Sequence, residues 1–471
     1  MESFFYPHSI VIYGASENFQ KSGNRVLRNI LNYTSKNVYL IHPRKESIKV
    51  NEITLKAYKT IFDLPVKNID LAIIILPVQY VLDALEECII FQVKSVILES
   101  GALYLKGEND EYNVNRINQI RVKLNKLNQT RVMGPNSIGI YSANKNGMDL
   151  TTSLIYFEKM PGLKKKNLSI VSQTGLTLSG LLLGQNYIQE VGISKIAAIG
   201  NKFDVTESDL LDYLESDPNT NAIALYLEDI KDGKRFMNQC KRISKKKPIL
   251  LLKSGKTEKG KKAIISHTKS MAGDYKIIEA MSKQMGIVTV EDFNELFTLS
   301  KMILSQPIPK GNRLAVISIS GAGTVLSCDL AEKYGLELPP MSKAQNEKMR
   351  EIYPKWAWED VYNPLDIWAS VELVGPNKTY EFAGETFLEE ESQFDALVYL
   401  ITGIKESEFD WDILHQINGN HPDIPIYMGF FGGDKKLLLN WREILEEKYD
   451  IPTFTSLSLM MKCISKALRL S

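Results

Sequence analysis

Short apolar runs rich in isoleucine, valine and leucine alternate along this chain with longer segments of mixed polar and apolar residues. Each longer segment can hold a helix. This order is typical of a parallel β-sheet whose strands are joined by crossover helices, so we expect an α/β fold. The predicted strands cover residues 9–14, 37–43, 71–77, 95–100, 130–136, 168–173, 193–200, 222–228, 248–255, 313–320, 396–403 and 424–430.

The predicted strands fall into three groups. The basic segment PGLKKKN (161–167) precedes the second group, and the turn-rich segment SQPIPKGN (305–312) precedes the third. A chain of 471 residues also exceeds what one hydrophobic core usually serves. We therefore expect three α/β domains. Their predicted bounds are residues 1–145, 150–304 and 311–471.

The charge of the chain is balanced, with 57 basic and 56 acidic side chains. It has no net field that would attract nucleic acid or an anionic membrane. The apolar runs are far shorter than the about 20 residues of a membrane span, and the first residues carry no secretion signal. We expect a cytoplasmic protein without a nucleic-acid or membrane partner. The four cysteines show no Cys-x-x-Cys spacing, so we predict neither a disulfide framework nor a metal site.

Each group opens with a strand that runs into a turn of small residues and then a predicted helix. The three segments are VIYGASENFQKSGN (11–24), IVSQTGLTLSG (170–180) and ISISGAGTVLS (317–327). A helix that starts directly after a strand offers unpaired N–H groups and the positive end of its dipole to an anion. None of the segments is a complete Gly-x-Gly-x-x-Gly or P-loop motif, and glycine there often serves close packing alone. Together they predict phosphate-binding turns.

His267 lies in the segment KKAIISHTKSMAGDY (261–275), after a strand-like apolar run and between Ser266 and Thr268. A lone histidine in such a place is more often a packed residue than a functional one. A metal ligand and a nucleophile are the alternatives. The segment taken alone leaves all three interpretations open.

Several motifs, in their order and spacing, resemble the nucleoside-diphosphate-forming acyl-CoA synthetases, which are relatives of succinyl-CoA synthetase. The resemblance runs nearly end to end. It implies a Rossmann-like CoA-binding domain followed by two flavodoxin-like domains of the succinyl-CoA synthetase type. The motifs are VIYGASENFQKSGNRVLRNIL, IHPR, MGPNSIGI, VSQTGLTLSG, GNKFDVTESDLLDYLESDP, YLEDIKDGKRF, KPILLLKSGKTEKGKKAIISHTKSMAGD, ISGAGTVLSCDLAEKYGLELPP and NPLDIW.

The segment around His267 resembles the family's S-H-T-G-x-x-A-G motif, which contains the histidine that is phosphorylated. The resemblance implies that His267 carries the phosphoryl group and that Glu228 hydrogen-bonds its ring. Without the resemblance, Glu228 would be read as a solvated acid at a strand end. The resemblance also implies that two helix starts hold the phosphate. These are Ser172, Gln173, Thr174 and Gly175 in the second domain, and Gly321, Ala322, Gly323 and Thr324 in the third.

Three lysines near His267 have no assigned role. Lys269 stands where the family usually has glycine, two residues after the histidine. It lowers activity if the loop needs glycine there, or stabilises the phosphohistidine if the loop tolerates a side chain. Lys253 and Lys256 could orient phosphate, but a lysine-rich loop is more often solvated surface. We leave both out of the predicted site.

The first domain resembles the family's CoA-binding domain. A nicotinamide-binding Rossmann domain is the alternative, and it is disfavoured because the second strand ends in IHPRKE, without the acidic residue that binds ribose. The resemblance implies that CoA phosphates lie at a helix start, that cations border the adenine-ribose end, and that later strand ends follow the pantetheine arm. These three groups are Gly14, Ser16, Lys21 and Asn24; Pro43 and Arg44; and Leu76, Pro77, Glu99, Ser100 and Asn136.

Nothing after residue 303 resembles the ATP-grasp domains that bind the nucleotide in this family. The resemblance therefore implies an α subunit that works with an ATP-grasp β subunit, as α2β2, with Mg-ATP or ADP on the partner. The implied reaction is acyl-CoA + ADP + phosphate ⇌ carboxylic acid + CoA + ATP, through acyl phosphate and phosphohistidine.

Two other functions stay open. One is a non-catalytic CoA-binding or regulatory protein, which Lys269 favours. The other is a subunit that transfers a carbamoyl or another acyl group without using the histidine. The acyl group is also open. Trp356, Trp358 and Trp368 are candidates for an acyl pocket, with core or interface positions as the alternative.

Overall fold

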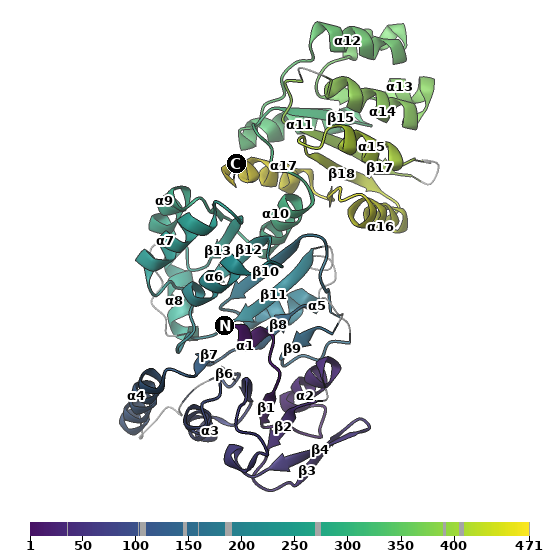
Figure 1. Ribbon diagram of the computed structural model, residues 1–471. Helices are drawn as coiled ribbons and strands as arrows, with labels where there is room; N and C mark the ends of the chain where they lie inside the picture. The colour runs from purple at the N-terminus through teal and green to yellow at the C-terminus, as the bar shows by residue number, and fades with distance from the viewer. Residues whose placement is uncertain are drawn as a thin grey trace. The chain divides into compact units, whose positions relative to one another are not determined.

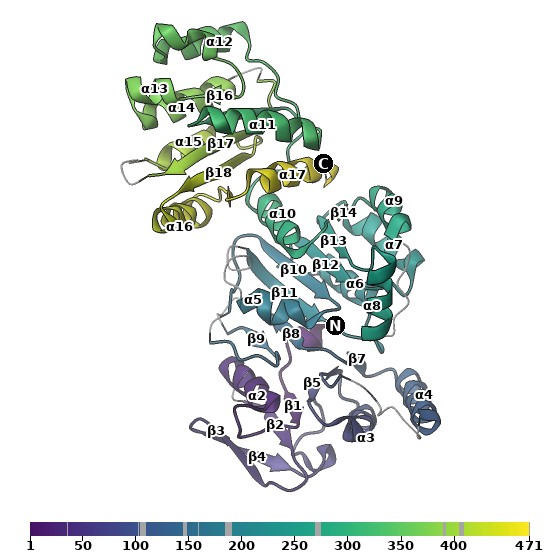
Figure 2. The ribbon, with the colours of Figure 1, turned by 180° about the vertical axis from the view of Figure 1, so that it is seen from behind.

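The computed structural model describes residues 1–34, 36–101, 103, 110–144, 148–158, 160–183, 191–268, 275–389, 392–404 and 409–470. The chain forms two compact units, Met1–Glu291 and Asp292–Ser471. The first unit contains two mainly parallel sheets and the second unit contains one (Figures 1 and 2). The bounds between three domains stay a prediction.

The first sheet has the strand order β3-β4-β2-β1-β5-β6-β7, and β3 alone is antiparallel to its neighbour. Along β1, Ile10 and Ile12 pack in one core cluster whereas Val11 and Tyr13 pack in another. Both faces of the sheet are therefore buried, which explains the continuous apolar run. The strands are β1 (Ile10–Tyr13), β2 (Val38–Ile41), β3 (Ser47–Val50), β4 (Ile53–Tyr58), β5 (Leu71–Ile74), β6 (Ser95–Leu98) and β7 (Arg131–Met133). The helices are α1 (Glu2–Phe5), α2 (Ser22–Tyr33), α3 (Val78–Ile90) and α4 (Asp110–Leu127).

The second sheet has the order β14-β13-β12-β10-β11-β8-β9. Its central strands are parallel, and β8 adds to β11 in the antiparallel direction. The strands are β8 (Gly139–Ser142), β9 (Leu150–Thr151), β10 (Asn167–Ser172), β11 (Gly192–Ala198), β12 (Ala222–Leu227), β13 (Ile249–Lys253) and β14 (Val288–Thr289). The helices are α5 (Gly180–Leu183), α6 (Glu207–Ser216), α7 (Gly233–Ile243), α8 (Glu258–Thr268) and α9 (Tyr275–Met285).

The second unit has the parallel order β16-β15-β17-β18-β19. Helix α10 (Phe293–Ser305) precedes this sheet and packs on α17 (Leu457–Ala467). Glu295 of α10 is buried there and pairs with Lys462 and Lys466. The strands are β15 (Leu314–Ser318), β16 (Leu365–Asp366), β17 (Ala396–Gly403), β18 (Ile426–Gly433) and β19 (Thr453–Phe454). The other helices are α11 (Gly321–Tyr334), α12 (Lys343–Met349), α13 (Trp368–Val374), α14 (Pro376–Phe387), α15 (Asp412–Asn420) and α16 (Lys435–Glu443).

Every strand predicted from the sequence is present. The additional strands are β3, β4, β8, β9, β14, β16 and β19. All of them except β4 have four residues or fewer, which is too short for a clear periodic pattern. Periodicity therefore gave no signal for them.

In each sheet the strand order reverses direction at one pair of neighbouring strands. The chain adds its next strand on one side of this pair and later strands on the other side. The pairs are β1/β5, β10/β12 and β15/β17. At such a point the two following connections diverge and leave a crevice beyond the carboxyl ends of the strands, where ligands of α/β proteins bind. The topology therefore selects three places for a functional site.

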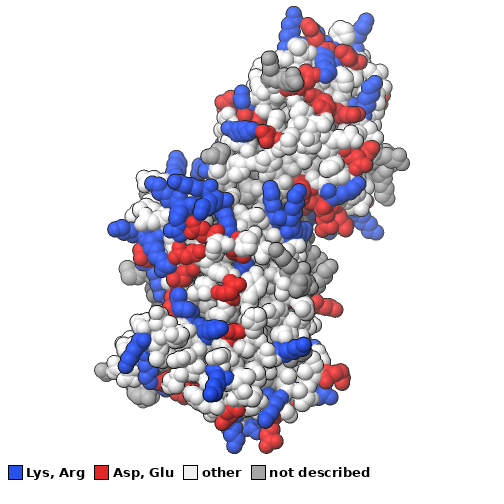
Figure 3. Space-filling view, in the orientation of Figure 1, with Lys and Arg blue, Asp and Glu red and all other residues white. Residues whose placement is uncertain are grey.

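Basic side chains gather over α7 and α9 on the face shown in Figure 3. On α7, Arg235 contacts Asp209 and Asp212, and Arg242 contacts Asp212 and Glu215. Acidic side chains of α6 thus compensate part of this basic surface. Among the described residues, no helix is both long enough and apolar enough to cross a membrane.

Candidate active site

The β1/β5 crevice contains the first predicted phosphate-binding turn. Gly14 follows β1 with φ +92°, and a Cβ at this position would lie 2.2 Å from the Ile75 carbonyl oxygen. A Cβ on Gly23 would lie 2.0 Å from the Gly14 carbonyl oxygen. Only glycine allows the start of α2, the strand end and its neighbour to approach this closely.

The loop between Gly14 and α2 differs from the direct strand-to-helix turn that we predicted. The helix begins at Ser22, with Lys21 as its N-cap residue. The side chain of Asn24 donates a hydrogen bond to the Ser16 carbonyl oxygen at 2.8 Å. This bond folds the loop back over the helix start, so Gly14, Ser16, Lys21 and Asn24 still lie together.

The end of β2 continues the same edge of the sheet. The Nδ1 atom of His42 accepts hydrogen bonds from the backbone N–H groups of Arg44 and Lys45 at 3.1 and 3.0 Å. Burial and the two neighbouring cations lower the pKa of His42. Lys45 also pairs with Glu17 of the α2 loop. Pro43 and Arg44 are thus held beside the loop predicted to bind CoA phosphates.

The ends of β5, β6 and β7 are joined by hydrogen bonds at the predicted pantetheine positions. Ser100 donates through Oγ to the Leu76 carbonyl oxygen at 2.6 Å, and Asn136 donates through its backbone N–H to the Ser100 carbonyl oxygen at 2.8 Å. Leu76 and Pro77 follow β5, and Asn136 follows β7. The structure therefore brings these residues to one edge.

Glu99, which directly follows β6, is buried among these residues. Neither of its carboxyl oxygens has a hydrogen-bond partner among the described residues. Burial raises the pKa of Glu99 well above its ordinary value, because a lone carboxylate is poorly solvated there. The raised pKa favours the neutral acid, which adds no negative charge to a crevice that would receive an anionic ligand.

The β10/β12 crevice brings together Gln173 and Glu228. The Oε1 atom of Gln173 accepts hydrogen bonds from the backbone N–H groups of Glu228 at 2.7 Å and of Asp229 at 3.0 Å. Its Nε2 atom donates to Asp229 Oδ1 at 2.7 Å. The Gln173 side chain thus holds the end of β12, and the Gln173 backbone N–H donates to the Tyr226 carbonyl oxygen at 3.0 Å.

Glu228 is held through its backbone while part of its carboxylate is unpaired. Lys253 donates through Nζ to the Glu228 carbonyl oxygen at 2.6 Å and to the Ser254 carbonyl oxygen at 2.7 Å. The Glu228 side chain is buried, and its Oε2 atom has no partner among the described residues. A buried, unpaired carboxylate oxygen is costly unless a donor completes it. The Glu228 Oε2 atom is therefore suited to accept a hydrogen bond from a donor that lies outside the described residues.

The helix predicted to start at Ser172 to Gly175 is a single 3-10 turn, Gly175–Leu178, followed by α5. Hydroxyl groups bond the local backbone here: the Thr174 side chain accepts from Leu176 N–H, and Thr177 donates to the Thr174 carbonyl oxygen. Ser172 Oγ accepts from Thr174 N–H at 3.1 Å. Such bonds compete with the α-helical ladder, which explains why the predicted helix start opens as a 3-10 turn.

The apolar run before His267 is helical, so the expectation of a strand-like segment was wrong. Helix α8 covers Glu258–Thr268. Its first turn carries an ion pair between Glu258 and Lys261, a spacing that supports a helix. The side chain of His267 and the whole of Lys269 lie outside the described residues. The contact between His267 and Glu228 therefore stays a prediction.

The β15/β17 crevice lies at the start of α11. The side chain of the N-cap residue Ser320 accepts a hydrogen bond from the Ala322 N–H. The Ser320 carbonyl oxygen accepts hydrogen bonds from the N–H groups of Gly323 and Thr324. A Cβ on Gly323 would lie 2.2 Å from Ser318 Oγ. Gly323 thus serves close packing of α11 on β15, whereas Gly321 is partly exposed at the helix start.

Comparison with known proteins identifies the family. Residues 8–143 match the CoA binding domain, and residues 165–303 match the succinyl-CoA ligase like flavodoxin domain. The chain is 32% identical to acetate–CoA ligase (ADP-forming) II subunit alpha of Pyrococcus furiosus, over 96% of this chain and 94% of that subunit. The chain belongs to the family of ADP-forming acid–CoA ligases.

Relatives in this ADP-forming ligase family differ in length. Acetate–CoA ligase (ADP-forming) II of Archaeoglobus fulgidus is 35% identical over 83% of this chain, which spans only 56% of that longer relative. The solved dinucleotide-forming acetyl-coenzyme A synthetase 1 of Ca. Korarchaeum cryptofilum, in complex with phosphate and ADP, matches with a TM-score of 0.81 and 26% identity. The match covers 100% of this chain and 96% of that chain. These matches confirm the predicted family and fold class.

Two buried lysines near the β10/β12 crevice lie outside the site predicted from the sequence. Lys202 donates through Nζ to Glu207 Oε2 and to the Asp229 carbonyl oxygen, both at 3.0 Å. Lys253 is 1% exposed, contrary to the interpretation of its segment as solvated surface. Both lysines come at or just after the end of an apolar strand, ILLLK and AAIGNK. A lysine in that position is a signal for a buried, bonded ammonium at the carboxyl edge of a parallel sheet.

Burial lowers the pKa of Lys253 to about 8, against the opposing influence of Asp229. The unfolded chain binds this proton more tightly than the folded chain does. The free energy of unfolding therefore rises as the pH rises from about 8 to the ordinary lysine value of about 10.4. We expect the urea midpoint of the wild type to rise relative to that of Lys253→Met across this range. Parallel pH profiles of the two proteins would show that the ammonium has an ordinary pKa.

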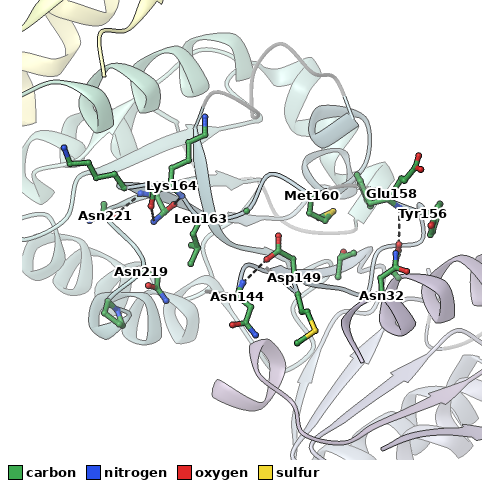
Figure 4. A pocket seen from close by; sticks show the side chains of 18 residues that line it. Asn32, Asn144, Asp149, Tyr156, Glu158, Met160, Leu163, Lys164, Asn219 and Asn221 are labelled. Atoms are coloured by element: carbon green, nitrogen blue, oxygen red, sulfur yellow. Dashed lines mark hydrogen bonds between the residues drawn. The ribbon is translucent and has the colours of Figure 1, made fainter. Parts of the chain in front are cut away.

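A polar hollow of about 940 Å³ lies at the opposite, amino end of the second sheet (Figure 4). Its side chains mostly support backbone. Asp149 accepts from Tyr141 O–H and from Asn144 N–H, and Asn221 accepts from Asn167 N–H. Because these groups are engaged within the fold and lie away from the carboxyl ends of the strands, the hollow is not part of the candidate active site.

Proposed function

We propose that this chain is the α subunit of an ADP-forming acyl-CoA synthetase. It interconverts acyl-CoA, ADP and phosphate with a carboxylic acid, CoA and ATP. The observation that carries the proposal is the β10/β12 crevice. Gln173 and Lys253 fix the backbone of Glu228 there, and the Glu228 Oε2 atom has no hydrogen-bond donor among the described residues. The family's phosphohistidine motif at His267 supplies such a donor.

The reaction proceeds in three displacements. A phosphate oxygen attacks the thioester carbonyl carbon, the C–S bond breaks, and the thiolate takes a proton to give CoA and acyl phosphate. A ring nitrogen of His267 then attacks phosphorus, and the carboxylate leaves. Finally, ADP takes the phosphoryl group from His267 to form ATP. Glu228 accepts a hydrogen bond from the ring N–H of His267. Its negative charge stabilises the positive charge that develops on the imidazole during the second displacement.

The β1/β5 crevice fits CoA as substrate. The cradle at Gly14 would be filled by a Cβ, and the buried acid Glu99 is unpaired and favoured in its neutral form. Ser16, Lys21 and Asn24 would hold the phosphates, with Gly14 allowing their close approach, and Pro43 and Arg44 would border the adenine-ribose end. The pantetheine arm would follow the strand ends at Leu76, Pro77, Glu99, Ser100 and Asn136.

The phosphoryl group on His267 needs two cradles and a nucleotide domain. Ser172 to Gly175 and Gly321 to Thr324 would hold it at the starts of the 3-10 turn and of α11. We propose an ATP-grasp β subunit, in an α2β2 assembly, as the partner that binds Mg-ATP or ADP. The four cysteines are free thiols, three of them buried, which agrees with a reducing, cytoplasmic location.

The function is tested by mixing the chain with the ATP-grasp chain of its own source. Acetyl-CoA and larger acyl-CoAs are supplied with ADP and phosphate, and ATP is measured. ATP formation that requires both chains supports the proposal. Formation of ATP without this chain, or no ATP with any acyl-CoA, contradicts it.

Replacing Ser16 with glutamate is expected to weaken CoA binding about 10- to 100-fold, because it puts charge and bulk where phosphate must approach. The bond from Asn24 to the Ser16 carbonyl oxygen should remain, although the bond from the Asn18 N–H to Ser16 Oγ at 3.2 Å is lost. Calorimetric titration of the chain with CoA measures the effect. Ser216→Glu, at the exposed end of α6, is the matched control and should bind CoA normally. Binding of NAD in place of CoA would overturn the assignment of this domain.

A further inference from the structure

Lys202 lies in the loop after β11, and this loop is bonded to the segment that directly follows β7. The N–H of Asn201 donates to the Pro135 carbonyl oxygen at 2.9 Å. The N–H of Phe203 donates to the Gly134 carbonyl oxygen at 2.8 Å. Between these two bonds the backbone of Lys202 is left-handed, with φ +54°, a conformation that is sparsely populated by residues other than glycine. Such a conformation persists where the surrounding structure enforces it, and it is frequent at functional sites.

The side chain of Lys202 is 1% exposed and serves two carboxylates. Its Nζ atom pairs with Glu207, which is buried at the start of α6, and with the carboxylate of Asp229. It also donates to the Asp229 carbonyl oxygen. Charges buried in this way contribute little net stability, because each of them loses its hydration. The arrangement instead fixes the direction of the groups that the ammonium contacts.

Asp229 transmits this constraint to Gln173. The Asp229 Oδ1 atom contacts the Lys202 ammonium and also accepts a hydrogen bond from Gln173 Nε2 at 2.7 Å. A side-chain amide has a donor end and an acceptor end, so an acceptor on one side decides which way the amide faces. With Nε2 toward Asp229, the Gln173 Oε1 atom faces the end of β12 and accepts from the Glu228 N–H at 2.7 Å. The contacts therefore run from Lys202, through two side chains, to the backbone of Glu228.

We propose that Lys202 is a positioning residue for phosphoryl transfer, which acts through Asp229 and Gln173 to aim the Glu228 carboxylate at the histidine ring. This inference rests on the proposed function, because it requires Glu228 to act at that ring. Lys253 holds the Glu228 carbonyl oxygen directly, whereas Lys202 sets the hydrogen bond to the Glu228 N–H. Without the Lys202 ammonium, Asp229 loses its cation and competes for Lys253, to which it is electrostatically coupled.

Replacing Lys202 with methionine is expected to slow phosphorylation of the chain by ATP about 10- to 100-fold, because a small displacement of an assisting group has an effect of this size. The value of kcat should fall by a similar factor. The Kd of CoA should stay within about two-fold of the wild type, since the loop is bonded to the CoA-binding domain through its backbone. The measurements are single-turnover phosphorylation with the ATP-grasp partner and calorimetric titration with CoA. Phosphorylation at the wild-type rate would overturn the inference.

Lys195→Met is the matched control for the loss of a buried ammonium. Lys195 of β11 is also 1% exposed, and it pairs with Asp217 at 2.7 Å. Asp217 follows α6, before β12 begins, so this pair lies toward the amino end of the sheet, away from the crevice. Both substitutions should lower the urea midpoint, because each leaves a buried carboxylate without its cation. Only Lys202→Met should slow phosphorylation of the folded enzyme, and equal slowing by both variants would overturn the inference.

A double-mutant cycle separates action through Glu228 from an independent effect. Adding Lys202→Met to Glu228→Gln should lower the rate by less than about two-fold more, because the carboxylate that Lys202 aims is already replaced. Effects that multiply would overturn the inference while the proposed function stands. A wild-type enzyme that is never phosphorylated would overturn the proposed function, and the inference with it. If Lys202→Met does not fold, the variant that also carries Glu207→Gln, and so retains one fewer buried charge, is measured in its place with the same expected outcomes.

Discussion

Replacing His267 with asparagine is expected to abolish both phosphorylation of the chain and formation of ATP. Asparagine retains polarity but removes the ring nitrogen that attacks phosphorus. The loss should exceed about 10⁴-fold, since the displacement has no substitute nucleophile. CoA affinity should stay within two-fold of the wild type, because the β1/β5 crevice is formed by other residues.

Mass spectrometry of the two-subunit complex under turnover identifies the modified residue. The phosphate should be labile in acid and stable in base, and should come either from ATP or from acyl-CoA with inorganic phosphate. His415→Asn is the matched control. His415 is exposed, stacks on Tyr449 and lies outside all three crevices, so its replacement should leave labelling and turnover unchanged. Normal turnover of His267→Asn would instead favour a histidine-independent acyl transferase, and CoA binding without any turnover of the wild type would favour a regulatory protein.

Replacing Glu228 with glutamine is expected to lower the rate about 100-fold or more, which is the usual contribution of a group that assists proton or charge transfer. The structure makes this substitution informative. Gln173 and Lys253 hold Glu228 through its backbone N–H and carbonyl groups, so glutamine should keep the position of the chain while removing the negative charge. CoA affinity should change little, because the interaction strengthens only as the histidine ring gains charge.

The measurements for Glu228→Gln are kcat, the rate of phosphoenzyme formation, and the Kd of CoA. Glu347→Gln provides the matched control, since Glu347 is an exposed acid of α12 whose contact with Lys343 is 3.8 Å long. Its kinetics should be those of the wild type. A fully active Glu228→Gln variant would show that the carboxylate has no role at the ring.

The order of strands and helices could be predicted because burial on both faces of a parallel sheet forces continuous apolar runs such as LAIIILP and ILLLK. The additional strands of two to four residues could not, since so few residues show no clear periodic pattern. The apolar residues before His267 were described as strand-like although they belong to α8, because three consecutive apolar residues fit either element. The family, and with it His267 and Glu228, depended on several motifs in order rather than on any single one.

The sequence by itself determined the α/β fold, the family and the residues that follow the central strands, because these are properties of neighbouring residues along the chain. Only the tertiary structure decided what those residues contact. Gln173 and Glu228 are 55 positions apart and meet because β10 and β12 are adjacent in the sheet. Lys253 is buried because the chain covers the end of β13, and Trp368, Tyr380 and Trp441 line one pocket because separate elements bring them together. Side-chain direction and strand adjacency arise from packing between distant segments, which no local pattern encodes.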